Sequence, residues 1–462
     1  MCRHRSSLLL ILILALALAD ALQAATPNYS VEEAVSRAQA QNPDIAIARK
    51  KVQAARGGLI EARSGYLPSV VSSGLARERQ HQSDSRLRNE DYSANVRVVQ
   101  NIYTGGAVSS QVAIARLNLE KQEYEYQAVA NRVSMDVRIT FNELLLNRAK
   151  IRVHEQSVGV LQEELKTQQQ RLGAGMVGQL NVSRAEVTLA NEQPELIDAQ
   201  TQLQNSYLRL SELFGMDLKA QSVHAQFEVT GQLQYQARHP DLNECLARAD
   251  VDRPEIKARQ IDVEIEEAQE KLDRSTLRPW VDVSSGYELY NERDPLIGHE
   301  FNHGYVLGLN AHWHIFDGFA TKGRIIATRA RRDAAAQTLE ATRRSVASEV
   351  RSAFLDLEQS DRVLESETKN VQTADESLEI AKGNLSAGLG TQLDVLQAAS
   401  DVTRTRTTRL SAIYLHNVAL ARLARACAVE PDALEFKPNA GETKEANKIV
   451  DLAMPPATLT QR

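Results

Sequence analysis

His312 and His314 come nearest to the spacing of a metal site, because they stand two positions apart in a segment of alternating polar and apolar residues. In a strand this spacing puts both imidazoles on one face, where they could bind a metal. Two histidines without a third ligand are more often plain polar groups, which is the interpretation we favour. The chain has no nucleophile elbow, Walker A run, HExxH or CxxC motif. The sequence therefore predicts no enzyme, no cofactor and no metal site.

Cys245 and Cys427 are the other candidates for chemistry. Two cysteines are too few for a disulfide framework, and the sequence leaves open whether they pair. Small, buried, apolar residues are the interpretation we favour for both.

Residues 1–24 have the pattern of a secretory signal peptide. Arg3 and Arg5 precede an apolar run over 8–19, and small residues before Ala25 offer a cleavage site. No later segment reaches the length of apolar sequence that a transmembrane helix needs, so we expect none in the exported chain. The net charge of −6 is mild and no basic run stands out, which argues against a nucleic-acid partner.

The rest of the chain carries one unit twice, with an offset of 211 to 213 residues. The matching segments are 42–43 and 253–254, 66–68 and 277–279, 101–105 and 314–318, 172–175 and 385–388, and 179–182 and 392–395. Each copy predicts a short helix, a longer helix that begins at a proline, two strands, a very long helix, a glycine-rich turn and a returning helix. We therefore expect a signal peptide (1–24), a first repeat (25–215), a connector (216–241), a second repeat (242–427) and a polar tail (428–462).

The two longest helices, expected at about 107–171 and 321–384, carry the strongest periodic signal. Apolar residues recur there every seven positions: Ala130, Val137, Leu144, Ile151, Val158, Leu165 and Leu172, then Val350, Leu357, Leu364, Val371, Leu378 and Leu385. This period predicts left-handed supercoiling against a partner helix. The companion positions are mixed and include His154 and Gln168, so a simple two-stranded coiled coil is not expected. Each helix would be roughly 100 Å long.

Four strands are expected, at about 70–79, 92–103, 281–290 and 305–316, and all but the first alternate clearly. Alternation over about ten residues is typical of membrane β-barrels, although a half-buried soluble sheet has the same period. The export signal favours the barrel. So do Trp280 and Trp313, the only tryptophans, which lie at the helix-proximal strand ends, where an aromatic girdle would be.

Four strands are too few to close a barrel, because a small barrel needs about eight. An open sheet edge is not tolerated in lipid. If these strands enter a membrane, several copies of the chain must therefore pool them.

The chain to about residue 430 resembles the TolC family of outer-membrane efflux and secretion channels. The resemblance rests on the twofold repeat, on Pro68 and Pro279 at the strand starts, on 102–106 and 315–319 after the strands, and on 387–396 at the long-helix turn. It implies a mainly α-helical homotrimer with a membrane β-barrel part of twelve strands and an α-helical tunnel through the periplasm. The implied partners are a periplasmic adaptor (membrane fusion) protein, an inner-membrane transporter and outer-membrane lipid.

The resemblance also implies a pore constriction. Asp394 matches a family aspartate, Gln397 replaces a second one, and Asn181 occupies the aspartate position in the first copy. Three copies of Asp394 would ring the mouth of the channel, and carboxylate rings favour cations. The alternative is a carboxylate that only complements the dipole of its helix.

The two turns that join the long helices to the returning helices are expected to be adaptor-docking tips. Their central residues are Gly175, Met176 and Val177 in the first copy, and Gly388, Leu389 and Gly390 in the second. Glycine permits a tight reversal, and exposed apolar residues beside it suggest that a partner covers them. The alternative is that the apolar residues pack beneath the turn.

Passive conduction in multidrug or small-molecule efflux is the function that we expect, because the chain carries no extra domain. The exit duct of a type I protein secretion system has the same architecture and remains an alternative. An exported coiled-coil scaffold is an alternative of another class; it explains the heptads but not the four alternating strands.

Overall fold

The structure of the protein is a computed structural model, and it describes residues 27–78, 90–217, 227–235, 237–238, 240–291, 301–431 and 434. The expected signal peptide lies outside these residues, as do most of the tail and part of the connector. The first half contains β1 (Asn28–Tyr29), α2 (Val31–Gln41), α3 (Pro43–Ser64), β2 (Ser69–Glu78), β3 (Glu90–Tyr103), α4 (Ala107–Gly173) and α5 (Gln179–Leu213). The second half contains β4 (Glu228–Val229), α6 (Leu242–Asp252), α7 (Pro254–Ser275), β5 (Trp280–Asn291), β6 (Phe301–His312), α8 (Ala320–Ser386) and α9 (Gln392–Ala426).

The two halves repeat the same order of helices and long strands, and equivalent helices have equal lengths. They have 11 residues in α2 and α6, 22 in α3 and α7, 67 in α4 and α8, and 35 in α5 and α9. This confirms a mainly helical fold built on a twofold repeat. Among the described residues, no helix has an apolar stretch of the length needed to cross a membrane.

The compact units of the structure differ from the two sequence repeats. One unit contains Met1–Ala46, Val129–Asp250 and Val346–Arg462, and the other contains Ile47–Ala128 and Val251–Ser345. Each unit takes segments from both copies. A repeat is therefore a unit of sequence, while packing joins equivalent parts of the two copies.

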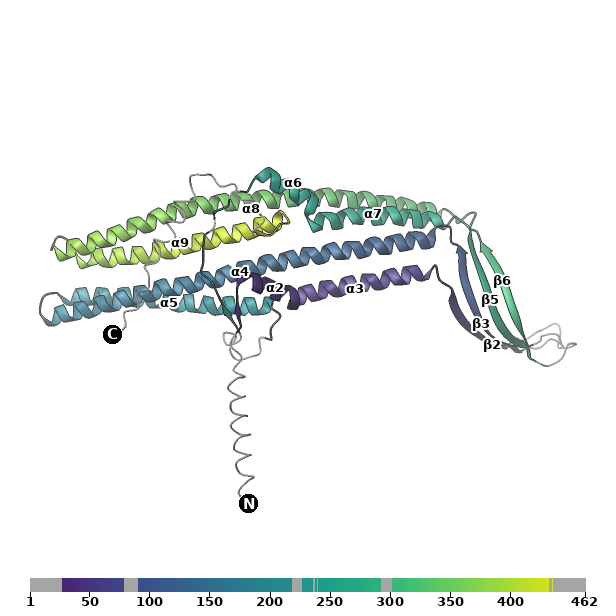
Figure 1. Cartoon of the computed structure of the whole chain (residues 1–462), viewed down its shortest axis with the longest axis horizontal. Helices are drawn as coiled ribbons and strands as arrows, with labels where there is room; N and C mark the ends of the chain where they lie inside the picture. The colour runs from purple at the N-terminus through teal and green to yellow at the C-terminus, as the bar shows by residue number, and fades with distance from the viewer. Residues whose placement is uncertain are drawn as a thin grey trace, which may run out of the picture. The chain divides into compact units, whose positions relative to one another are not determined.

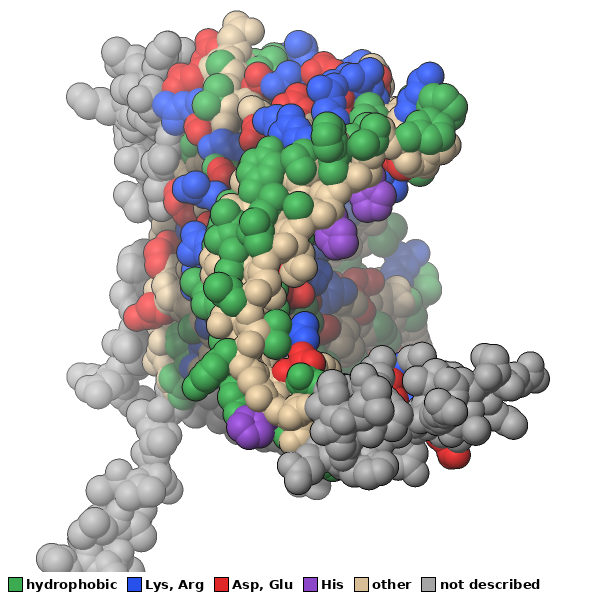
Figure 2. Space-filling view, turned by 90° about the vertical axis from the view of Figure 1, so that its right-hand side faces the viewer, with side chains coloured by type: hydrophobic (Ala, Val, Ile, Leu, Met, Phe, Trp, Pro, Cys, Tyr) green, Lys and Arg blue, Asp and Glu red, His purple; other side chains and the backbone are tan. Residues whose placement is uncertain are grey.

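Strands β2, β3, β5 and β6 form one antiparallel sheet in that order, with β2 and β6 at its edges (Figure 1). The register aligns apolar positions across the sheet: Val70 lies opposite Val98, Val96 opposite Tyr287, and Tyr287 opposite Tyr305. In β2, Val71 and Leu75 fall on the other face. Figure 2 faces this sheet and shows hydrophobic side chains gathered along it.

The opposite face of the sheet carries the polar partners. Arg77 pairs there with Asp91, and the Arg97 guanidinium lies 2.8 Å from the Glu288 carboxylate. The Asn310 amide donates a hydrogen bond of 2.9 Å to Asp282. The sheet therefore has one apolar face and one polar, charged face.

The boundaries of the last strand were predicted incorrectly. It spans Phe301–His312 and not 305–316, because its partner β5 begins at Trp280, which lies opposite His312. Beyond His312 no ladder partner remains, so His314 lies outside the strand and the two histidines do not share a strand face. Within the described residues, no group of three or more His, Cys, Asp or Glu side chains could hold a metal ion.

The heptad positions of α4 and α8 all lie in one compact unit and are buried or half-buried. The α4 helix packs against α5 of its own copy, where Asn147 donates a hydrogen bond of 2.9 Å to Ser206. It also packs against α9 of the other copy, where Thr403 donates one of 3.0 Å to Ser157. The seam therefore faces more than one helix, as the mixed companion positions indicated.

Candidate functional site

The turn between α4 and α5 closes with the double hydrogen bond of a Schellman motif. The Met176 N–H donates to the Arg171 carbonyl at 2.8 Å, and the Gly175 N–H donates to the Leu172 carbonyl at 2.9 Å. Gly175 has a φ of 69°, a left-handed conformation that glycine adopts without a Cβ clash. The glycine predicted to make this turn therefore does so.

The turn between α8 and α9 has the same construction. The Leu389 N–H donates to the Asn384 carbonyl at 2.8 Å, and Gly388 has a φ of 74°. Gly390 serves a different purpose, because a Cβ there would lie 3.0 Å from the Cβ of Asn384. Glycine at this position lets the chain pass close to the last turn of α8.

The apolar residues of these turns differ in exposure. Met176 and Leu389 occupy equivalent positions after the two helices, and their exposed fractions are 74% and 83%. A Schellman motif often packs this residue against its helix, but neither side chain is packed here. Val177 is half-buried. Packing beneath the turn therefore fits Val177 and does not fit Met176 or Leu389.

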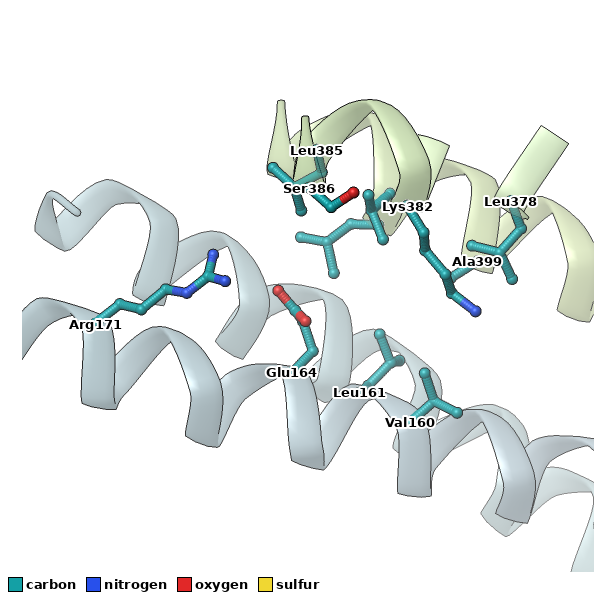
Figure 3. A pocket seen from close by; sticks show the side chains of 11 residues that line it. Val160, Leu161, Glu164, Arg171, Leu378, Lys382, Leu385, Ser386 and Ala399 are labelled. Atoms are coloured by element: carbon teal, nitrogen blue, oxygen red, sulfur yellow. The ribbon is translucent and has the colours of Figure 1, made fainter. Parts of the chain in front are cut away.

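A groove of about 330 Å³ lies near these turns, between α4, α8 and α9. Figure 3 shows Glu164 of α4 pointing into it, with Lys382 of α8 on the opposite side. The Glu164 carboxylate accepts hydrogen bonds of 2.8 Å from the Gln168 amide and 3.0 Å from the Gln392 amide. Both glutamines are buried, and their side-chain oxygens have no hydrogen-bond donor among the described residues. Neither glutamine is among the residues that line the groove, so their amides act by orienting the Glu164 carboxylate.

Sequence reasoning did not identify this groove. Its one available signal was Gln168, a polar residue among the companion positions of the heptad seam. The partner Gln392 lies more than two hundred residues later in the chain, so only the tertiary structure brings it to Glu164.

Asp394 lies in the first turn of α9 and is exposed. Its carboxylate accepts hydrogen bonds of 2.8 Å from both the backbone N–H and the hydroxyl of Thr391, and these lower the pKa of the Asp394 carboxyl below its usual value. The Asp394 N–H donates in return to the Thr391 hydroxyl, which completes a capping box. The spacing of Thr391 and Asp394 is a known sequence signal for such a cap.

The other two residues expected at the constriction, Gln397 and Asn181, do not form a capping box. Gln397 is exposed one turn along α9 and lies 3.4 Å from the Asp401 carboxylate. Asn181 is half-buried in the first turn of α5, where its N–H donates to the Gly178 carbonyl. Gly178 is the N-cap of α5 and provides no side-chain hydrogen bond, so the first copy lacks the cap of the second.

The two tryptophans lie at the same end of the paired strands β5 and β6. Trp280 opens β5 opposite His312, and Trp313 follows β6, where its indole N–H donates a hydrogen bond of 3.1 Å to the Leu277 carbonyl. Three further large apolar residues are exposed after β6, in the 315–319 motif, and the sequence analysis did not count them among the interface aromatics: Ile315, Phe316 and Phe319.

Comparison with known proteins adds a family match over most of the chain. Residues 34–216 and 245–429 match the model of the family described as outer membrane efflux protein. The chain is 25% identical to protein CyaE of Bordetella pertussis over 406 residues, which are 86% of this chain and 84% of that protein. It is also 25% identical to the proteases secretion protein PrtF of Dickeya chrysanthemi, over 40% of each chain.

Solved structures share the fold. The outer membrane protein VceC of Vibrio cholerae superposes with a TM-score of 0.73 at 18% identity, covering 86% of this chain and 96% of that chain. The predicted fold of the TolC family is thus confirmed at the level of the chain.

Proposed function

We propose that this chain, which belongs to the outer membrane efflux protein family, is one subunit of a trimeric channel that crosses the outer membrane and extends into the periplasm. The sheet carries this proposal, because it has one apolar face and two open edges, β2 and β6. An edge in lipid must be paired. Pairing β6 of one subunit with β2 of the next closes a barrel of twelve strands from three chains.

The two faces of the sheet then have separate roles. Apolar side chains such as Leu307 and Leu309 face lipid, and Trp313 lies at the membrane interface, whereas Trp280 lies opposite His312 on the other face. The ion pairs Arg77–Asp91 and Arg97–Glu288 lie on the other face and line a water-filled interior. Polar interiors of this kind are typical of membrane barrels with channels.

The turns and the nearby groove form the docking site for the periplasmic adaptor. Met176 and Leu389 offer exposed apolar contacts, and the groove offers the charged groups of Glu164 and Lys382. A helical hairpin of the adaptor fits both features, because it can bury apolar side chains while its polar side chains pair with Glu164 and Lys382. The inner-membrane transporter supplies the energy, and the channel conducts passively.

Small-molecule efflux is the first candidate for the cargo class, and the family description, which names efflux, is compatible with it. Protein secretion is the second candidate, favoured by the likeness to PrtF, whose name records secretion of proteases. The two differ in what must pass. For small-molecule efflux, expression with a cognate adaptor and transporter should lower the accumulation of a fluorescent efflux substrate in the cells. For protein secretion, the same expression should release a protein cargo into the medium.

Mass in detergent tests the assembly. We expect the solubilised protein to have three times the mass of the mature chain by light scattering, and to produce conductance steps in a planar lipid bilayer. The reason is that a single four-stranded sheet leaves its edges unpaired. A stable, non-conducting monomer with full strand content would contradict the proposal.

The charge of Asp394 is tested by Asp394→Asn. If three copies ring the mouth, the substitution should weaken cation selectivity and move the reversal potential in a salt gradient toward zero. Because the pKa of Asp394 is lowered, its capping contribution is fully present above the usual aspartate pKa and its charge persists below that value; both are lost as the pH falls through the lowered pKa.

Thr391→Ala is the matched control for this prediction. It removes the capping hydroxyl and leaves the carboxylate in place, so selectivity should be retained while the start of α9 is weakened. Unchanged reversal potentials in Asp394→Asn would show that the carboxylate serves only as a helix cap.

A further inference from the structure

Cys245 and Cys427 are two buried thiols for which the channel function has no use. Cys245 lies in the first turn of α6, and Cys427 is the C-cap residue of α9. Both belong to the same compact unit, and their exposed fractions are 4% and 0%. Both are present as reduced thiols in the structure.

The two side chains contact each other. A hydrogen bond between the thiols lowers the pKa of Cys245, and burial opposes this effect. The residues are far apart in the chain, so this contact exists only because α6 packs against the end of α9. Two thiols within hydrogen-bonding reach need little movement to form a sulfur–sulfur bond.

The first copy has other residues at the two positions equivalent to these cysteines. The equivalents of Cys245 and Cys427 are Ala34 on α2 and Phe214 after α5, and both are fully buried. There, α2 is held to the end of α5 by the Asn42 amide, which donates a hydrogen bond of 2.9 Å to the Leu213 carbonyl.

Aromatic packing reinforces that junction in the first copy. The Phe214 ring lies 5.5 Å from the Tyr29 ring and 5.3 Å from the Phe227 ring, measured between centroids. The second copy has no aromatic ring at position 427, and cysteine replaces both members of the pair. Where the first copy has the Phe214 ring at the contact between its short helix and its returning helix, the second copy therefore has two adjacent thiols.

We propose that Cys245 and Cys427 form a disulfide in the exported protein, which joins the start of the second repeat to its end. The proposal rests on the proposed function, because export places the chain in an oxidising compartment where disulfides persist. Formation occurs by thiol–disulfide exchange with an oxidised dithiol oxidase. The two cysteines lose two protons and two electrons as their sulfurs bond, and the disulfide of the oxidase takes these up to become a dithiol.

Burial determines when the bond forms and how it resists reduction. Exchange requires attack by a thiolate on an accessible disulfide, so it takes place before α6 and α9 complete their packing. Once the chain is folded, a reductant cannot reach the bond. The disulfide closes most of the second repeat into one loop, which restricts the unfolded chain.

Thiol mapping of the wild-type trimer tests the proposal. The protein is purified from outer membranes without reductant, denatured in the presence of an alkylating maleimide, digested, and analysed by mass spectrometry. We expect unalkylated peptides containing Cys245 and Cys427 to be found joined, and lighter than the two free peptides by two hydrogen atoms. Denaturation with a reductant should yield both peptides separately and alkylated.

Two outcomes separate this proposal from the channel function. Alkylated Cys245 and Cys427 in a trimer that conducts would overturn the disulfide and leave the channel intact. A joined peptide in a protein that neither trimerises nor conducts would support the disulfide and reject the channel.

The variant Cys245→Ala with Cys427→Ala provides a second measurement. In the wild type, reductant added during thermal unfolding should lower the unfolding midpoint, because the bond becomes accessible as the chain opens. In the variant the midpoint should be the same with and without reductant. A wild-type midpoint that does not respond would also contradict the bond.

Discussion

Export is expected to stop when Met176 and Leu389 are both replaced by aspartate. Each substitution would put an unpaired carboxylate into an apolar contact with the adaptor, and burying such a charge is costly. A loss of about 1.4 kcal/mol already lowers an affinity tenfold, and two sites should exceed that. The measurements are accumulation of a fluorescent efflux substrate and cross-linking of the turns to a cognate adaptor.

Assembly of the double variant should be normal. Both side chains are exposed, and both turns belong to a different compact unit from the sheet. The exchange Met176→Leu with Leu389→Met is the matched control, because it keeps an apolar side chain at each position, and it should export normally. Wild-type export by the aspartate variant, at a normal outer-membrane level, would show that these residues do not carry the contact.

Leu307→Arg is expected to prevent stable insertion of the barrel. Leu307 lies in the middle of β6 on the apolar face, with an exposed fraction of 80% in the single chain. An arginine on the lipid face near the bilayer midplane costs about 2–4 kcal/mol, and a trimer presents it three times. The amount of heat-modifiable, protease-resistant trimer in outer membranes should fall sharply.

Asn310→Arg is the control on the same strand. Asn310 lies on the polar face, opposite Asp282, which can pair with the new guanidinium. Its trimer level should therefore remain near that of the wild type. Equal losses in the two variants, or none in either, would show that the two faces do not differ as proposed.

The elements of this fold could be predicted from the sequence because local rules determine them. The seven-residue spacing from Val137 to Leu144 and onward predicted helices that contact a partner. Pro43 and Pro254 marked the starts of two helices, and both begin there. Gly175 and Gly388 marked turns that require a positive φ. Each signal depends on residues within a few positions of one another.

The ends of elements were less predictable. Alternation continues past His312 in the sequence, so a strand was expected to 316, but the ladder ends where β5 provides no further partner. Only part of the role of Asp394 could be predicted, for a similar reason. Its cap with Thr391 is local, whereas a ring of carboxylates depends on how three chains assemble.

The sequence by itself determined the twofold repeat, the helices, the turns and the alternating faces of the strands, because these follow from short-range spacing and backbone preferences. Only the tertiary structure decided which distant residues meet. It placed Tyr287 between Val96 and Tyr305, brought Gln392 to Glu164, and set Cys245 against Cys427. Such contacts depend on the packing of whole helices and sheets, and no pattern within one segment specifies its partner.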